Sequence, residues 1–169
     1  DADRLAIVDE NGNYIGEEYT LALAAKYIFS KMKGSAAANL STSRMIDDIA
    51  AQHNCEVIRT PVGEANVADA MVKNECVIGG EGNGGVIDLR VGPIRDSLVG
   101  MALVLQLMAE TGKSISELVS EIGGYYVYKA KAAANKDEAA AIIERTKAQY
   151  PDAKINTSDG CRFDFADGW

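Results

Sequence analysis

Short apolar segments alternate with segments of helical periodicity through the first 123 residues, and this alternation most constrains the fold. Between the apolar segments, hydrophobic residues recur at the three- and four-residue spacing of amphipathic helices. The resulting β-α-β-α-β-α-β order is typical of a domain in which helices cover both faces of a sheet. We therefore expect an α/β fold, a three-layer α/β/α domain with a mixed four-stranded sheet. The expected strands are residues 5–9, 36–40, 56–60 and 76–78.

Helices are expected between and after these strands. The hydroxyl run Ser41-Thr42-Ser43 has the chemistry of a helix N-cap. Residues 96–112 are apolar on nearly every side, which predicts a helix packed between layers or domains. The expected helices cover residues 17–33, the residues after Ser43, residues 64 to about 75, 96–112 and 115–122.

The pattern changes after residue 123. Tyr125–Tyr128 is expected to be a strand, and an alanine-rich helix should run from Asp137 to about Gln149, before Pro151. Two further strands are expected at Ile155 and at 162–165. We predict that residues 1–123 form an α/β domain and that 124–169 form the front part of an α+β domain.

Composition excludes several classes of function. The 169 residues are 47% hydrophobic and 25% charged, as in ordinary soluble domains. A net charge of −8 argues against nucleic-acid and anionic-membrane partners, although a small phosphorylated ligand needs only a few local cations. The three cysteines have no CxxC spacing, and no signal peptide or membrane-spanning run is found. These features favour a cytoplasmic protein.

Asp1-Ala2-Asp3-Arg4 is the first group that could carry chemistry. Two carboxylates one residue apart on a loop can offer oxygens to Mg²⁺, and Arg4 could neutralise a phosphate. A solvated chain end is the alternative, and spacing alone favours it. Because a globular protein would rarely place its first residue inside such a cluster, we expect the chain to be a piece of a longer enzyme.

The glycine-rich segment Gly79–Gly85 is the second group. Its five glycines would let the backbone approach a ligand, while Glu81 and Asn83 present an acceptor and an amide that suit adjacent sugar hydroxyls. It lacks the spacing of a nucleotide phosphate loop. A flexible connector is the alternative, but a loop directly after a buried strand favours a functional role.

Two weaker candidates follow the same logic. The turn from Arg59 to Glu64 could place a helix N-terminus at an anion, or it could be only a tight structural turn. Arg90, Arg95 and Asp96 flank Gly92-Pro93. One of these arginines could bind phosphate, although surface ion pairs are the more common use.

Four motifs follow one another along the chain: Asp-Ala-Asp-Arg at 1–4, Thr-Pro-Val-Gly at 60–63, Gly-Gly-Glu-Gly-Asn-Gly-Gly at 79–85 and Ser-Asp-Gly-Cys-Arg-Phe-Asp-Phe at 158–165. In this order they resemble the α-D-phosphohexomutases, the family of phosphoglucomutase, phosphomannomutase and phosphoglucosamine mutase. The resemblance covers essentially the whole chain, and it implies the third of four domains and the start of the fourth.

The resemblance implies roles for individual residues. Asp1 and Asp3 match the second and third carboxylates of the family's Mg²⁺ loop, and the first would lie two residues before Asp1. Arg4 matches the arginine of that loop and is the implied catalytic residue. Glu81 and Asn83 match the sugar-recognition loop, with Asn83 in place of the more usual serine; Gly85 likewise replaces a frequent histidine, which leaves the preferred sugar open.

The resemblance also implies a mechanism and partners. A phosphoserine in the first domain would phosphorylate a hexose phosphate, and the hexose 1,6-bisphosphate would reorient and return its other phosphate. The phosphoserine and the fourth-domain phosphate loop are not among these residues, so we expect the chain to need the other domains of its polypeptide and to be inactive and weak in Mg²⁺ binding alone. A non-catalytic sugar-phosphate-binding module and a purely structural α/β domain are the alternatives.

Overall fold

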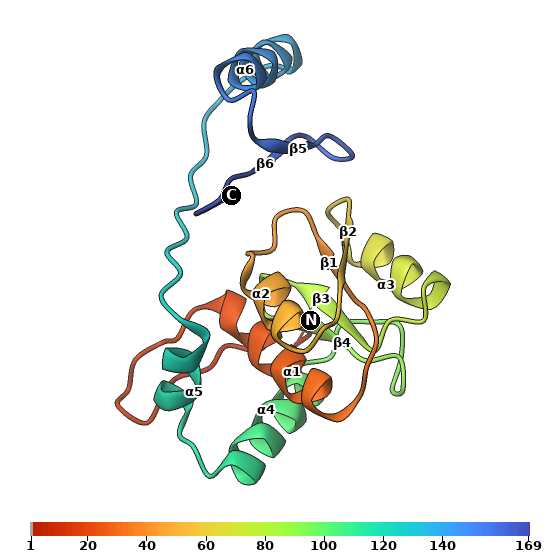
Figure 1. Ribbon diagram of the computed structural model, residues 1–169, viewed down its shortest axis with the longest axis vertical. Coiled ribbons are helices and arrows are strands. Elements are labelled where there is room, and N and C mark those ends of the chain that lie inside the picture. The colour runs from red at the N-terminus through yellow and green to blue at the C-terminus, as the bar shows by residue number, and fades with distance from the viewer. Residues whose placement is uncertain (1) are drawn as a thin grey trace. The chain divides into compact units, whose positions relative to one another are not determined.

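The computed structural model describes residues 2–169, and the chain divides into two compact units, residues 1–125 and 126–169. The first unit contains a four-stranded sheet in the order β2-β1-β3-β4 (Figure 1). Strand β1 pairs in parallel with β2 and β3, whereas β3 and β4 are antiparallel. The strands are β1 (Ala36–Asn39), β2 (Val57–Thr60), β3 (Ile78–Glu81) and β4 (Gly85–Ile87). The mixed four-stranded sheet is therefore confirmed.

Helices cover both faces of this sheet, which confirms the three-layer α/β/α prediction. Helix α1 (Glu17–Lys31) packs against β3 and β4, with α2 (Met45–Gln52) and α4 (Ser97–Thr111) beside it. Helix α3 (Glu64–Lys73) contacts β1, β2 and β3 from the opposite face (Figure 1). The short helix α5 (Ile115–Ile122) contacts α1.

The alternating side chains of β1 divide the core between these two layers. Ala36 and Ala38 belong to the cluster formed with α1 and α2, while Ala37 belongs to the cluster formed with α3. All three are fully buried, as expected for a central parallel strand covered on both faces. Their small side chains let the helices on each face lie close to the strand.

The prediction of a strand over residues 5–9 is wrong. This segment forms only an isolated bridge between Val8 and Tyr14, and Leu5 N donates to Gly84 O at 2.9 Å. The fourth strand is instead β4, which begins at Gly85, the last residue of the segment that was expected to be a ligand-binding loop. Gly84, with φ of 90°, supplies the left-handed turn that lets β4 fold back on β3.

The helix ends show how local polar groups are used. The hydroxyl run Ser41-Thr42-Ser43 caps α2 only in part: Arg44 is the N-cap and its side chain makes no capping hydrogen bond, but Ser43 Oγ accepts from the backbone N–H of Met45 at 3.4 Å. Asp96 caps α4 by accepting from the backbone N–H groups of Leu98 and Val99.

Among the described residues, no single helix is long and apolar enough to cross a membrane. By length and composition alone, one pair of helices passes the same test, α4 and α5, which are bent by 93° at the break between them.

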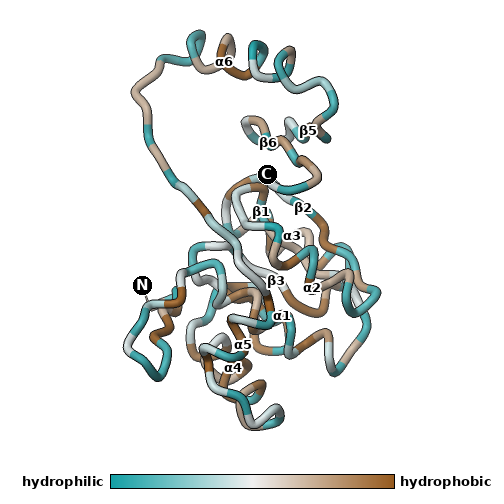
Figure 2. The backbone as a smooth tube through the Cα atoms, turned by 60° about the vertical axis from the view of Figure 1, so that its left-hand side comes forward, coloured by the Kyte–Doolittle hydropathy of each residue, from teal (hydrophilic) through white to brown (hydrophobic). Residues whose placement is uncertain are grey.

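The second unit contains α6 (Lys136–Gln149) and a two-stranded antiparallel sheet of β5 (Lys154–Asn156) and β6 (Arg162–Asp164). Helix α6 and both strands confirm the predictions for this region. The strand predicted at Tyr125–Tyr128 is wrong, since no strand partner pairs with it in the described residues. Hydrophobic and hydrophilic residues follow one another along α6 (Figure 2), and none of its residues is buried.

Candidate functional site

Polar side chains meet where the parallel strands β1 and β3 end. Asn39 is the last residue of β1 and Glu81 the last residue of β3. Asn39 Nδ2 donates to Glu81 Oε1 at 2.5 Å. Because ligands of α/β sheets bind beyond the carboxyl ends of parallel strands, this is the edge at which a site is expected.

The carboxylate of Glu81 is surrounded by donors from the protein. Besides Asn39, it accepts from Gly63 N at 3.3 Å, from Asn83 Nδ2 at 3.3 Å and from an Arg95 nitrogen at 2.6 Å. Four donors match the four lone-pair positions of a carboxylate. Glu81 is only 4% exposed, so a sugar hydroxyl would reach it by replacing one of these donors. Among the donors from side chains, Asn83 makes the longest hydrogen bond, at 3.3 Å, and is the easiest to replace.

The N-terminus of α3 faces this same carboxylate. Gly63 is the N-cap of α3, and its backbone N–H donates to Glu81 Oε1. The sequence predicted that the turn from Arg59 to Glu64 could serve an anion. In the structure the anion beside this turn is the protein's own Glu81.

Arg95 joins Glu81 to two other carboxylates. One terminal nitrogen lies 2.6 Å from Glu81 Oε2 and the other 2.6 Å from Asp3 Oδ2. Nε lies 3.3 Å from Glu64 Oε2, an ion-pair distance without hydrogen-bond geometry, and Arg95 N donates to Glu64 Oε1 at 2.6 Å. The Arg95 side chain is 13% exposed. A nearly buried guanidinium thus faces three acidic side chains from three segments.

The loop after β1 is fixed on the other side of Glu81. Arg59 donates to the carbonyl oxygens of Asn39, Thr42 and Ser43 at 2.8 to 2.9 Å, and it also pairs with Asp47. Thr42 Oγ1 accepts from the backbone N–H of Gly82 at 2.9 Å. The Arg59 bonds attach the β1 loop to β2, and the Thr42–Gly82 bond attaches it to the β3–β4 hairpin.

The hairpin glycines accommodate the protein's own atoms. A Cβ at Gly82 would overlap the carboxylate of Glu18, and a Cβ at Gly85 would overlap the side chain of Arg95. Asn83 Oδ1 accepts from Gly85 N at 3.2 Å, which stabilises the turn. The close approach that glycine permits is used here for packing against neighbouring segments.

The predicted metal segment is only partly described. Asp1 lies outside the described residues, Asp3 pairs with Arg95, and Arg4 is exposed. Within residues 2–169, no group of three or more histidine, cysteine or acidic side chains is arranged to hold a metal ion. The described residues therefore do not form a metal site by themselves.

The other predicted cluster separates into distinct structural roles. Arg90 binds Asp88, whose side chain is 3% exposed, while Asp96 caps α4. Burial alone would raise the pKa of Asp88, but the hydrogen bonds and charge of Arg90 outweigh it and leave that pKa below its ordinary value. Only Arg95 of this cluster reaches the candidate site.

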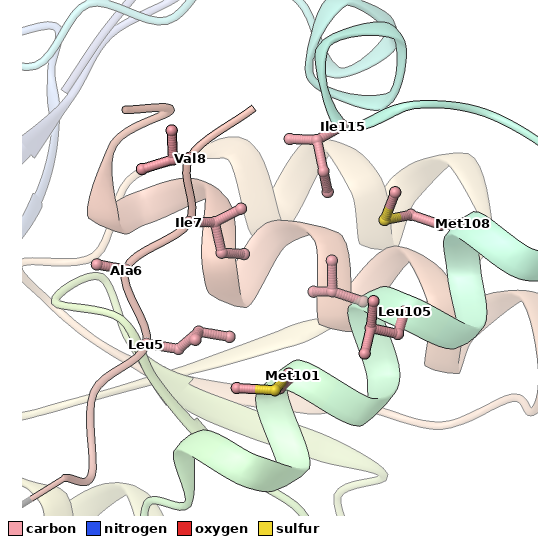
Figure 3. Close-up of a pocket in the computed structure, with 9 residues that line it drawn as sticks. Leu5, Ala6, Ile7, Val8, Met101, Leu105, Met108 and Ile115 are labelled. Carbon is pink, nitrogen blue, oxygen red and sulfur yellow. The ribbon is translucent and has the colours of Figure 1, made fainter. Parts of the chain in front are cut away.

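An apolar pocket of about 340 Å³ lies elsewhere in the first unit. Figure 3 shows Leu5 and Ile7 of the N-terminal segment facing Met101 and Leu105 of α4, with Ile115 of α5 nearby. Its lining offers no charged side chain to a phosphate. The polar edge at Glu81 is therefore the better candidate for a sugar-phosphate site.

Comparison with known proteins identifies this domain. Residues 16–125 match the family described as phosphoglucomutase/phosphomannomutase, alpha/beta/alpha domain III. The chain belongs to this phosphohexomutase family. The matched region contains Asn39, Glu81 and Arg95, so the polar edge described above is part of a phosphohexomutase domain III.

Individual relatives agree with this assignment. The chain is 38% identical over 173 residues to a phosphoglucomutase/phosphomannomutase of Thermococcus kodakarensis, and 36% identical over 174 residues to a probable phosphoglucosamine mutase of Methanopyrus kandleri. Both matches cover 100% of this chain and 38% of the relative. The chain thus spans well under half the length of these relatives.

A solved structure shows the same fold. A phosphoglucomutase/phosphomannomutase family protein from Burkholderia thailandensis superimposes with a TM-score of 0.80 at 22% identity. The match covers 99% of this chain and 36% of that chain. At this identity the likeness establishes the fold.

Proposed function

We propose that the full-length protein carrying this chain is a phosphohexomutase that interconverts hexose 1-phosphates and 6-phosphates. The observation that carries this proposal is the position of Glu81 and Asn83 at the carboxyl end of β3, inside a domain III of this family. A phosphoserine elsewhere in the polypeptide would transfer its phosphoryl group to the free hydroxyl of the hexose phosphate. The bisphosphorylated sugar would then return its other phosphate to the serine.

In this proposal the present chain supplies sugar recognition. Glu81 would accept hydrogen bonds from sugar hydroxyls, and Asn83 could exchange its 3.3 Å contact with Glu81 for one with the sugar. The exposed Arg4 would meet a phosphate as the catalytic cation of its segment. We also propose Mg²⁺ for the full-length protein, with Asp1 and Asp3 as ligands completed by a further carboxylate; Asp3 would first have to leave Arg95.

The test uses the full-length protein primed with a hexose 1,6-bisphosphate. We expect it to interconvert the phosphates of at least one of glucose, mannose and glucosamine. Glu81→Gln removes charge but keeps the shape, and it should lower kcat/KM by about tenfold or more, because hydrogen bonds to charged groups contribute about 1.5–3 kcal/mol. The matched control, Glu56→Gln at an exposed position, should leave kcat/KM unchanged.

Absence of turnover with all three sugars would overturn the mutase proposal. Unchanged kcat/KM in Glu81→Gln would remove Glu81 from the site while leaving the mutase standing. The 169-residue chain should show no turnover alone. Saturable binding of a hexose phosphate to this chain, combined with an inactive full-length protein, would favour a non-catalytic binding module.

A further inference from the structure

Arg95 stands outside the four family motifs, and the sequence indicated it only as an arginine that could bind phosphate. Its three guanidinium nitrogens face three different carboxylates, those of Asp3, Glu64 and Glu81, at 2.6 to 3.3 Å. The Glu81 side chain is 5% exposed, so its charge has little solvent to stabilise it. An ionised carboxylate in such a place needs a charged or strongly hydrogen-bonding partner.

The partners of Arg95 leave its guanidinium little freedom. Glu64 holds both the backbone N–H and the Nε edge of this residue, and Gly85 leaves room for its side-chain stem. Glu64 stands in the first turn of α3, next to Gly63, whose N–H also donates to Glu81. The orientation of Glu81 is thus set from α3 and from the segment before α4.

We propose that Arg95 is a positioning residue that fixes the Glu81 carboxylate for the sugar, with Glu64 holding Arg95 through its backbone N–H and its Nε edge. This inference rests on the proposed function of Glu81. Arg95 acts through Glu81, which meets the sugar in both the ground state and the transition state. Loss of the correct Glu81 orientation therefore raises KM more than it lowers kcat.

Lysine cannot substitute for this arginine. Its single ammonium lies at one point, so it cannot face three carboxylates along separate directions as the planar guanidinium does. Arg95→Lys keeps the positive charge among the acidic side chains, which preserves folding better than a neutral replacement. Arg90→Lys is the matched control, because Arg90 also pairs with a nearly buried carboxylate, that of Asp88, and does not contact Glu81.

The experiment measures kcat and KM of the full-length protein for its best hexose phosphate, with folding checked by circular dichroism. Arg95→Lys should raise KM about tenfold, the equivalent of one charge-assisted hydrogen bond, and leave kcat within about threefold. Arg90→Lys should change neither constant by more than about twofold. A purely structural role would lower the melting temperature without this KM increase in the folded enzyme.

A second variant keeps the inference testable if Arg95→Lys does not fold. Glu64→Gln retains an acceptor for Arg95 N but removes the charge that holds Nε, so KM should rise severalfold with kcat nearly unchanged. Unchanged KM in folded Arg95→Lys, or in Glu64→Gln where the lysine variant does not fold, would overturn the inference and leave the mutase proposal intact. An inactive wild-type protein would overturn both.

Discussion

The two units of this chain differ sharply in how many of their hydrophobic residues are buried. The buried hydrophobic residues that the structure describes, from Leu21 to Leu118, all lie in the first unit. In the second unit only Arg162 is buried, and it pairs with Asp164. Helix α6 nevertheless begins with a complete capping box at Asn135 and Glu138.

This difference shows that favourable capping and helix propensity do not replace a buried core as a source of stability. Capping and alanine content favour α6 as a helix, but most helical stability in proteins comes from burying an apolar face. The described residues give α6 no such burial. We therefore expect the free energy of unfolding to reside in the first unit.

The largest contrast should come from removing matched side chains in each unit. Ile46, 1% exposed in the core, and Ile142, 47% exposed on α6, are both helical isoleucines. Ile46→Ala should cost about 2–5 kcal/mol in unfolding free energy, and Ile142→Ala less than about 0.5 kcal/mol. Denaturant titration followed by circular dichroism gives both values. Equal losses would show that α6 is packed as tightly as α2.

A smaller contrast should come from adding one methyl group. A Cβ at Gly79 would overlap Met71 and lie 2.8 Å from Ala37 O, whereas nothing lies within 4 Å of a Cβ at Gly168. Gly79→Ala should therefore destabilise the first unit by about 1–3 kcal/mol through overpacking. Gly168→Ala should leave the denaturation midpoint unchanged. A tolerated alanine at Gly79 would mean that Met71 can move aside.

The smallest contrast concerns the helix caps. Asp96→Ala and Asn135→Ala each remove a side chain that accepts from two backbone N–H groups. Such caps contribute about 1 kcal/mol. Asp96→Ala should lower global stability, because α4 belongs to the core, while Asn135→Ala should only speed amide exchange within α6. A global loss from Asn135→Ala would contradict the separation of the units.

The sequence predicted the helices better than the strands. Helical periodicity identified α1, α4 and α5 within a few residues of their observed ends. Residues 5–9 have the apolar character of a strand, yet they make only an isolated bridge. Apolar content is a local property, whereas strand pairing depends on distant partners. Because glycine is unfavourable in strands, the glycines after Ile78 did not predict the end of β3 or the start of β4.

The candidate site was predicted only in part, because some of its residues stand in a local motif and others meet only through contacts between distant segments. Glu81 and Asn83 stand in a motif, so the sequence already indicated them as candidates. Asn39 ends a run of three alanines, and a polar residue closing so apolar a strand was a signal that could have been used. Arg95 was indicated only as an arginine that could bind phosphate, and its carboxylate partners could not be predicted because the β3–β4 hairpin and Glu64 of α3 bring them together only in three dimensions.

The packed hairpin has a consequence for ligand binding. Gly82 N donates to Thr42, Gly85 N donates to Asn83, and Gly84 O accepts from Leu5. A turn with these two amides bonded and its glycine faces packed has few alternative conformations, so the amides of Gly82 and Gly85 should exchange slowly with solvent. A ligand meeting Glu81 would find a preorganised acceptor and lose little affinity to ordering the loop.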